Sequence, residues 1–78
     1  MSNIEIYNKV FVDTLGVKDS DLAGLEYLAV AGWDSLGHMS LIANLEDAFN
    51  IMMDTDDIID FSSYEKGKEI LAKYDVDF

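Results

Sequence analysis

Apolar residues in the first part of the chain recur at the spacing of an α-helix. Four of them are separated by three, four and four positions and so share one helix face: Ile4, Tyr7, Phe11 and Leu15. Ser2 and Glu5 have the spacing of a capping box, and Gly16 suits the left-handed conformation that ends many helices. The pattern predicts a helix over residues 3–15.

Residues 16–33 show no clear period, although they are too apolar for a free linker. The large apolar residues of this segment are Leu22, Leu25, Tyr27, Leu28, Val30 and Trp33. A long loop without structure is uncommon in a compact domain. We therefore predict a loop that packs onto the core, with one helical turn near residues 21–28.

A second helix is predicted over residues 35–49. Asp34 is a suitable N-cap for it, and Asn50 can adopt the left-handed conformation at its end. With about 100° between successive residues, its apolar side chains span an arc of roughly 240°. A helix that lies on one core needs an apolar stripe of only about 100°. The helix is therefore either central in the fold or carries a second apolar patch that faces a partner.

The position of this second patch follows from the same arrangement. Met39 and Ala43 lie on the same side of the predicted helix as Ser35. Glu46 lies close to them, and Asp47 lies at the edge of the patch.

Two further helices are predicted in the last third of the chain. Residues 54–60 begin with acidic side chains, which the positive end of a helix dipole favours, and form one short helix. Ser62 and Glu65 have the spacing of a capping box and predict a last helix of about residues 63–74. Gly67 lies inside that helix at a cost of about 1 kcal/mol relative to alanine, so we expect a close packing contact there.

The predicted fold class is all-α. No segment alternates as a strand does, and there are no repeats. The pattern predicts a small four-helix bundle with three longer helices, a short third helix and a long first loop. A length of 78 residues fits one domain, which we expect to span residues 1–78.

The charge of the chain is strongly negative and unevenly distributed. Sixteen acidic residues face five lysines and no arginine, which gives a formal net charge of −11. All the lysines lie outside residues 19–65, so the net charge belongs to the middle of the chain. Nucleic acid is excluded as a partner, because phosphate binding needs clustered basic residues. The acidic stretch is either a solvated surface or a docking surface for basic partners.

Composition excludes several other classes. The absence of cysteine removes disulfides, thiolate metal sites and a cysteine nucleophile. No apolar run approaches the roughly 20 residues that span a bilayer, and the start of the chain lacks the basic and apolar regions of a signal peptide. We expect a cytoplasmic protein.

The sequence gives little support for an enzyme. His38, the only histidine, follows Ser35 by three residues, which could bring the two together on one helix face. Residues 32–37 do not match the G-x-S-x-G pattern, and no strand precedes the serine. We therefore expect no catalytic residues and interpret His38 as an inert surface histidine.

A calcium-binding loop is also disfavoured. Four acidic residues fall at positions 1, 3, 7 and 12 of a possible EF-hand loop: Asp54, Asp56, Asp60 and Glu65. Position 5 would be Ile58, which has no side-chain oxygen, and position 6 would be Ile59, where the loop requires glycine. We expect no specific metal site.

Ser35 is the most suggestive single residue. It lies at the start of the second predicted helix, where free backbone N–H groups and the helix dipole would stabilise a phosphodiester on its hydroxyl. From these residues alone, Asp34 and Ser35 are better explained as ordinary capping residues.

Two motifs and the order of the helices resemble those of acyl carrier proteins over the whole chain. Residues 34–36 match the D-S-L motif of that family, and residues 45–49 match its L-E-x-x-F segment at the right distance. The resemblance implies that Ser35, beside Asp34, carries a covalent 4′-phosphopantetheine arm. It also implies docking residues on the second helix: Leu36, Met39, Ala43, Glu46 and Asp47.

The resemblance further implies a carrier rather than an enzyme. A holo-acyl-carrier-protein synthase, which is a phosphopantetheinyl transferase, would attach the arm from coenzyme A. Enzymes with basic docking surfaces would then load and remove acyl or aminoacyl groups, held as thioesters. We expect a monomer, since a carrier visits several enzymes.

The chain departs from the carriers of fatty acid synthesis at several positions. Gly37 and His38 stand where Asp and Thr are common, Trp33 replaces a small residue, and Asn50 replaces a glycine. We expect Gly37 to loosen the first turn of the helix. The departures favour a dedicated carrier of a specialised pathway, such as a polyketide, modified-sugar or aminoacyl route. The alternatives are the general carrier of fatty acid synthesis and an acidic interaction module without phosphopantetheine.

Overall fold

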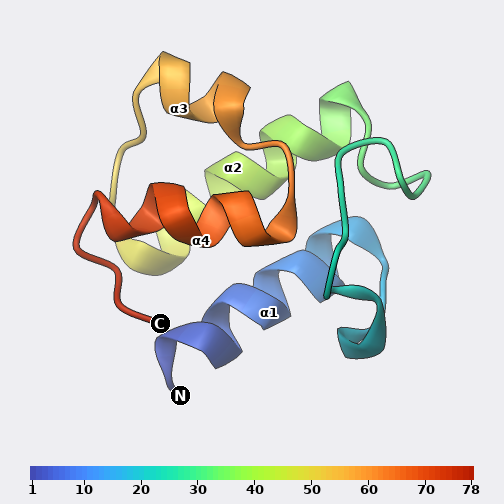
Figure 1. Ribbon diagram of the computed structural model, residues 1–78, viewed down its shortest axis with the longest axis horizontal. Helices are drawn as coiled ribbons and strands as arrows, with labels where there is room; N and C mark the ends of the chain where they lie inside the picture. Colours follow the sequence, from blue (N-terminus) through green and yellow to red (C-terminus); the bar gives the residue numbers. More distant parts are fainter.

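The chain folds into four α-helices with no β-strand (Figure 1), as the sequence predicts. The computed structural model describes all of residues 1–78. The helices are α1 (Asn3–Leu15), α2 (Ser35–Phe49), α3 (Thr55–Asp60) and α4 (Tyr64–Ala72), with a short 3₁₀ helix at Asp19–Asp21. α1 packs against α2, and α3 lies at the opposite end of the molecule from the two chain termini (Figure 1). No helix combines the length and the apolar character needed to cross a membrane.

The caps predicted for the first two helices are confirmed. Ser2 and Glu5 form a reciprocal capping box, and Gly16 ends α1 with φ of 69°. Asp34 caps α2 by accepting a hydrogen bond from the Gly37 N–H, and Asn50 ends it in the left-handed conformation. Because these signals are local, both helices have the bounds that the pattern predicts.

The first loop is held against the segment between α3 and α4. This agrees with the prediction that the loop packs onto the core. The Tyr27 N–H donates to the Ser62 carbonyl and the Tyr64 N–H to the Leu25 carbonyl, both at 2.9 Å. Glu26 therefore forms an isolated antiparallel bridge with Ser63, and the helical turn predicted near residues 21–28 is wrong. The 3₁₀ helix lies earlier, at Asp19–Asp21.

The same pairing changes the start of α4. Ser63 is the N-cap and accepts a hydrogen bond from the Lys66 N–H, so the predicted capping box of Ser62 and Glu65 is wrong. The Ser62 carbonyl is instead bonded to the first loop. α4 also ends at Ala72 and is therefore shorter than the predicted helix of residues 63–74.

The core is rich in aromatic rings. Its largest fully buried side chains are Trp33, Tyr7, Phe11, Phe61, Leu41, Ile42, Leu45 and Leu71. Gly67 confirms the expected close contact, since a Cβ atom there would collide with the Phe61 ring and the Tyr7 hydroxyl. The Tyr7 hydroxyl donates to the Tyr64 carbonyl at 2.7 Å, and burial raises its pKa.

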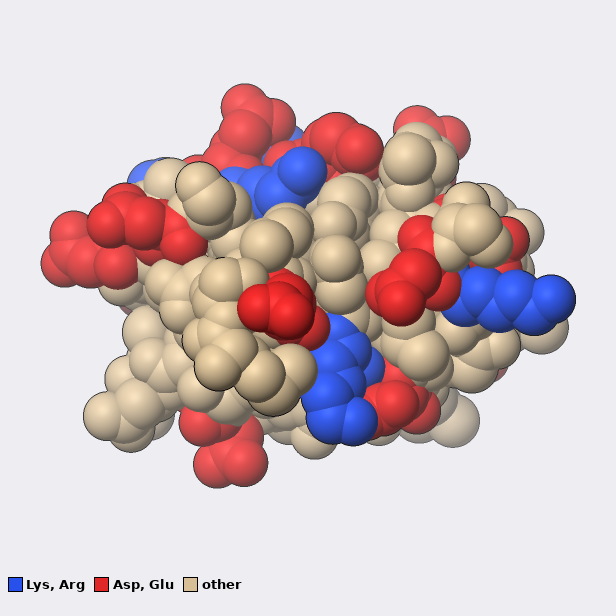
Figure 2. Space-filling model, turned by 90° about the horizontal axis from the view of Figure 1, so that it is seen from below, with Lys and Arg blue, Asp and Glu red and all other residues tan.

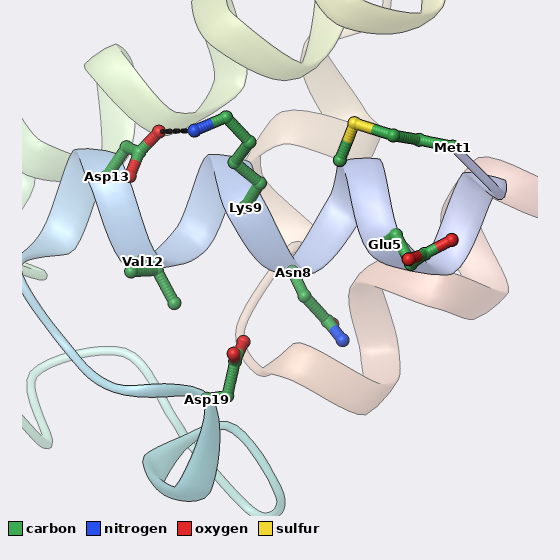
Figure 3. Close-up of a pocket in the computed structure, with 7 residues that line it drawn as sticks. All are labelled: Met1, Glu5, Asn8, Lys9, Val12, Asp13 and Asp19. Atoms are coloured by element: carbon green, nitrogen blue, oxygen red, sulfur yellow. Dashed lines mark hydrogen bonds and ion pairs between the residues drawn. The ribbon is translucent and has the colours of Figure 1, made fainter.

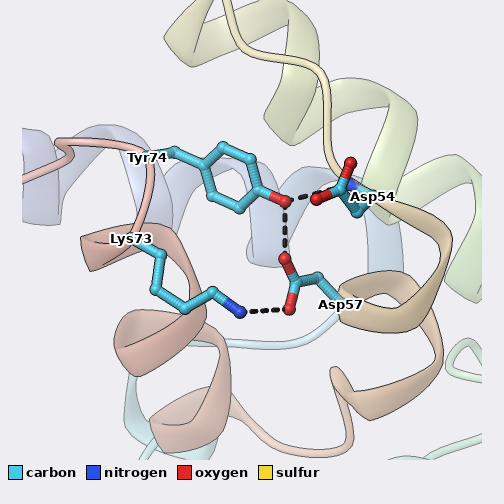
Figure 4. A network of polar contacts seen from close by, with 4 residues as sticks. All are labelled: Asp54, Asp57, Lys73 and Tyr74. Carbon is cyan, nitrogen blue, oxygen red and sulfur yellow. Dashed lines mark hydrogen bonds and ion pairs between the residues drawn. The ribbon is translucent and has the colours of Figure 1, made fainter.

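The short helix α3 is fixed to the end of α4 by a polar network (Figure 4). Asp57 is only 6% exposed and accepts hydrogen bonds from the Lys73 ammonium and the Tyr74 hydroxyl, both at 2.5 Å. The Tyr74 hydroxyl also accepts from the Asp54 N–H at 2.9 Å. The hydrogen bond from Lys73, followed by that from Tyr74, lowers the pKa of Asp57. No group of three or more possible ligands is placed to hold a metal ion.

The lowered pKa of Asp57 predicts a loss of stability in acid. A carboxylate whose pKa is lower in the folded than in the unfolded state stabilises the fold above its unfolded pKa, and this contribution disappears as the pH falls through the folded pKa. We expect Asp57→Asn to reduce the free energy of unfolding at neutral pH and to flatten its decline between about pH 5 and pH 2. Urea unfolding across this range measures both effects. Asp56→Asn, at a neighbouring exposed residue, is the control and should keep the wild-type slope. Equal slopes for the wild type and both variants would contradict the assignment of the acid-induced loss of stability to Asp57.

Candidate functional site

Ser35 is the first residue of α2, and its side chain is exposed. Asp34 holds the next turn, because its carboxylate accepts from the Gly37 N–H and its carbonyl accepts from the His38 N–H, both at 2.8 Å. The N–H groups of Ser35 and Leu36 have no acceptor within the protein. Two free donors at the positive end of a helix therefore lie next to an exposed hydroxyl, an arrangement that fits an attached phosphodiester.

Two glycines give the turn before α2 its compact path. A Cβ atom on Gly37 would collide with the Gly32 carbonyl oxygen, and one on Gly32 would collide with the Leu15 carbonyl oxygen. The start of α2 is thus packed tightly against its own preceding loop and, through it, against the end of α1. The expectation that Gly37 loosens this turn is wrong, because the absence of a side chain permits a close backbone contact.

Trp33 and His38 connect this turn to α3. The fully buried Trp33 donates its indole N–H to His38 Nδ1 at 3.0 Å, and His38 Nε2 lies 2.8 Å from the Ile58 carbonyl oxygen. Because indole only donates and a carbonyl only accepts, this arrangement requires a neutral His38 with its proton on Nε2. His38 is partly buried and bridges α2 to α3, so its interpretation as an inert surface residue is wrong.

The bridge also bears on the serine–histidine pair. Both ring nitrogens of His38 have partners elsewhere, and no hydrogen bond joins the ring to the Ser35 hydroxyl. The geometry therefore gives Ser35 no general base.

An apolar cleft of about 350 Å³ opens beside Ser35, between α2 and α3. Its lining residues are Tyr27, Ser35, His38, Met39, Ile58, Ile59, Phe61 and Ser62. Their position next to an exposed hydroxyl makes the cleft a place where a tethered group can lie. Of these residues, the sequence predicts only Ser35 and Met39 as site residues. His38 was expected to be inert, and the others come from the first loop, from α3 and from the segment after α3.

A second hollow of about 380 Å³ lies beside α1 and differs in character (Figure 3). Most of its lining is polar, and Lys9 and Asp13 in its wall form an ion pair at 2.9 Å. Lysines also lie among the acidic side chains on the face in Figure 2. Because the wall of this hollow is mostly polar and carries charges of both signs, we place the candidate site at α2.

The second apolar patch predicted on α2 is open to solvent. Leu36 is 80% exposed, Met39 is 56% exposed, and Ala43 is exposed as well. α2 also contributes to the core from its other side, through Leu41, Ile42 and Leu45. Ile59 of α3, 72% exposed, adds an apolar side chain that the sequence pattern did not single out.

The two acidic residues of the expected docking surface differ in their surroundings. Asp47 is exposed, whereas Glu46 is partly buried and accepts a hydrogen bond from the Met53 N–H at 2.9 Å. Glu46 therefore also holds the loop after α2.

An exposed serine at a helix start, two free N–H groups and an adjoining apolar cleft define a domain suited to hold a covalently attached group. A family model described as the phosphopantetheine attachment site matches residues 9–66, which include all of α2 and the cleft. The chain belongs to this family and is a phosphopantetheine-bearing carrier protein. No curated protein matches the chain at a significant level.

Membership of the family sets the general role of the protein. Its cofactor is covalent 4′-phosphopantetheine, and carrier domains of this kind are not themselves catalytic. They interact with a phosphopantetheinyl transferase and with enzymes that handle acyl groups.

Proposed function

We propose that Ser35 is the attachment residue and that the protein carries an acyl or aminoacyl group on its arm. The observation that supports this most directly is the exposed Ser35 hydroxyl beside the unpaired N–H groups of Ser35 and Leu36. When bound, the arm supplies a terminal thiol that holds the cargo as a thioester. The chain itself provides the phosphodiester oxygen and two N–H donors for the phosphate charge.

The neighbouring residues serve attachment and recognition in different ways. Asp34 fixes the first turn of α2 through the Gly37 N–H and so keeps Ser35 outside the core. Leu36, Met39 and Ala43 provide an apolar surface for a partner enzyme, and Asp47 and Glu46 provide negative charge at its edge. A partner with a basic rim and an apolar centre fits this surface, and the charge accelerates the encounter.

The partners we propose are the transferase that attaches the arm and enzymes that load and remove the cargo. The departures at Trp33, Gly37 and His38 favour a dedicated carrier in a specialised biosynthetic pathway over the general carrier of fatty acid synthesis. We further propose that residues 1–78 act as one carrier domain, as a monomer and in the cytoplasm.

Loading with coenzyme A tests the attachment residue. We expect wild-type protein, incubated with coenzyme A, magnesium and a transferase of broad specificity, to gain the mass of one phosphopantetheine arm, located on the Ser35 peptide by mass spectrometry. Ser35→Ala should gain nothing, because the proposed attachment hydroxyl is gone. Ser40→Ala, at another exposed serine of α2, is the matched control and should load as wild type does.

Two results would contradict the proposal. An arm on Ser35→Ala would move the attachment to another residue. A wild-type protein that gains no arm would instead favour the alternative, an acidic interaction module that recruits basic partners without a cofactor.

A further inference from the structure

Three rings form a wall between the cleft beside Ser35 and the interior of the protein. We call Trp33, His38 and Phe61 the ring wall. The Trp33 and His38 rings are stacked with centroids 6.3 Å apart, and the Phe61 centroid lies 6.1 Å from that of His38 and 6.4 Å from that of Trp33. His38 and Phe61 line the cleft, while Trp33 is fully buried behind them.

The ring wall is held by hydrogen bonds as well as by packing. Trp33 donates to His38 Nδ1, and His38 Nε2 contacts the Ile58 carbonyl of α3. Moving α3 away from α2 far enough to open the wall would break the second bond, and moving Trp33 would leave a buried indole N–H without a partner. Leaving such a group unpaired is costly, so the wall resists opening.

The space behind the ring wall is also filled. The Phe11 centroid lies 5.5 Å from that of Trp33 and 6.2 Å from that of Phe61, and Phe11 is fully buried. The hollows of the molecule all open to solvent, and none is enclosed within the core.

We propose that the ring wall keeps the carried group out of the core, and that Trp33 and His38 thereby select short-chain acyl or aminoacyl cargo. This inference rests on the proposed attachment at Ser35. A group tethered there finds only the open cleft between α2 and α3. A short group has little apolar surface to leave in water, whereas a long alkyl chain would leave much of its surface in water, which the hydrophobic effect opposes.

Two loaded forms of the wild-type protein test the inference. Acetyl-coenzyme A and dodecanoyl-coenzyme A, with a transferase of broad specificity, would attach the short or the long thioester to Ser35. Trp33 is the only tryptophan, so its fluorescence reports directly on the ring wall. We expect the same emission spectrum from both forms, and rates of thioester cleavage by hydroxylamine within about twofold of each other, since neither thioester is shielded from solvent.

The possible failures are distinguishable. A dodecanoyl form with a shifted Trp33 emission and a thioester cleaved about tenfold more slowly would show that the chain enters the core, and would overturn the inference while the proposed function stands. If no arm attaches to Ser35, the proposed function fails and the inference fails with it.

Variants of the ring wall provide the complementary test. His38→Ala removes one ring and both hydrogen bonds of the bridge, and we expect it to protect the dodecanoyl thioester several-fold more than wild type does. Trp33→Phe, which keeps a ring but lacks the N–H, is the milder variant and should protect it to a smaller extent. Ser40→Ala should behave as wild type. If the two wall variants fold and give the wild-type cleavage rate, the ring wall does not exclude the chain and the inference is overturned.

Discussion

Replacing Trp33 with alanine is expected to leave a large fraction of the protein unfolded at room temperature. The side chain is fully buried and packs against Phe11, Phe61 and His38. Truncating a buried tryptophan to alanine costs about 3–5 kcal/mol, because contacts are lost and a cavity remains. A core of this size supplies only about 3–5 kcal/mol of net stability, so one substitution can remove nearly all of it.

Circular dichroism and urea unfolding measure this effect. Trp33→Phe is the matched control, since it keeps a large apolar ring and removes the hydrogen bond to His38. We expect it to remain folded with a free energy of unfolding lower by about 1–3 kcal/mol, the cost of an unsatisfied buried polar atom plus some lost packing. A Trp33→Ala protein with the wild-type urea midpoint would show that the first loop contributes little to the core.

The elements that could be predicted from the sequence are those specified by neighbouring residues. The bounds of α1 and α2 follow from a stripe of apolar residues and from caps such as Ser2, Gly16 and Asn50, all within a few positions of the helix ends. The exposed patch on α2 could be predicted for the same reason. α2 carries more apolar side chains than one buried face requires, and this excess can be read from the residues of the helix alone.

The features that could not be predicted depend on residues far apart in the chain. The start of α4 is set by residues 62–64 pairing with residues 25–27 of the first loop, and no pattern in either segment indicates its partner. The burial of Asp57 could not be predicted for the same reason. Its acidic neighbours suggest a solvated helix start, whereas the hydrogen bonds from the distant Lys73 and Tyr74 hold its carboxylate in a buried position.

The candidate site combines both kinds of information. Ser35 and its cap are local and were identified from the order of residues, whereas the cleft beside it needs the placement of α3. The role of His38 depends on the Ile58 carbonyl twenty residues away. Glu46, expected as a docking residue, also stabilises the loop after α2 through the Met53 N–H, a second role that sequence spacing does not reveal.

Substitution of Gly37 with alanine provides the sharpest test of how α2 begins. In the interior of an ordinary helix this change stabilises a protein by up to about 1 kcal/mol. Here the added Cβ atom would collide with the Gly32 carbonyl oxygen, and Gly32 cannot withdraw because it already lies against the Leu15 carbonyl. We therefore expect the opposite sign, a loss of about 1–3 kcal/mol in the free energy of unfolding, as for other overpacked sites.

The same substitution should also slow the attachment of the arm. The Gly37 N–H bonds to the Asp34 carboxylate, so a displaced turn would change the position of Ser35 relative to the free N–H groups. Urea unfolding measures the stability, and the initial rate of arm transfer from coenzyme A measures the effect on the site. Ser40→Ala should show neither defect, because it adds the same helix former at an exposed position of α2. A Gly37→Ala protein as stable as wild type would mean that the turn before α2 can relax, and its glycines would then need another explanation.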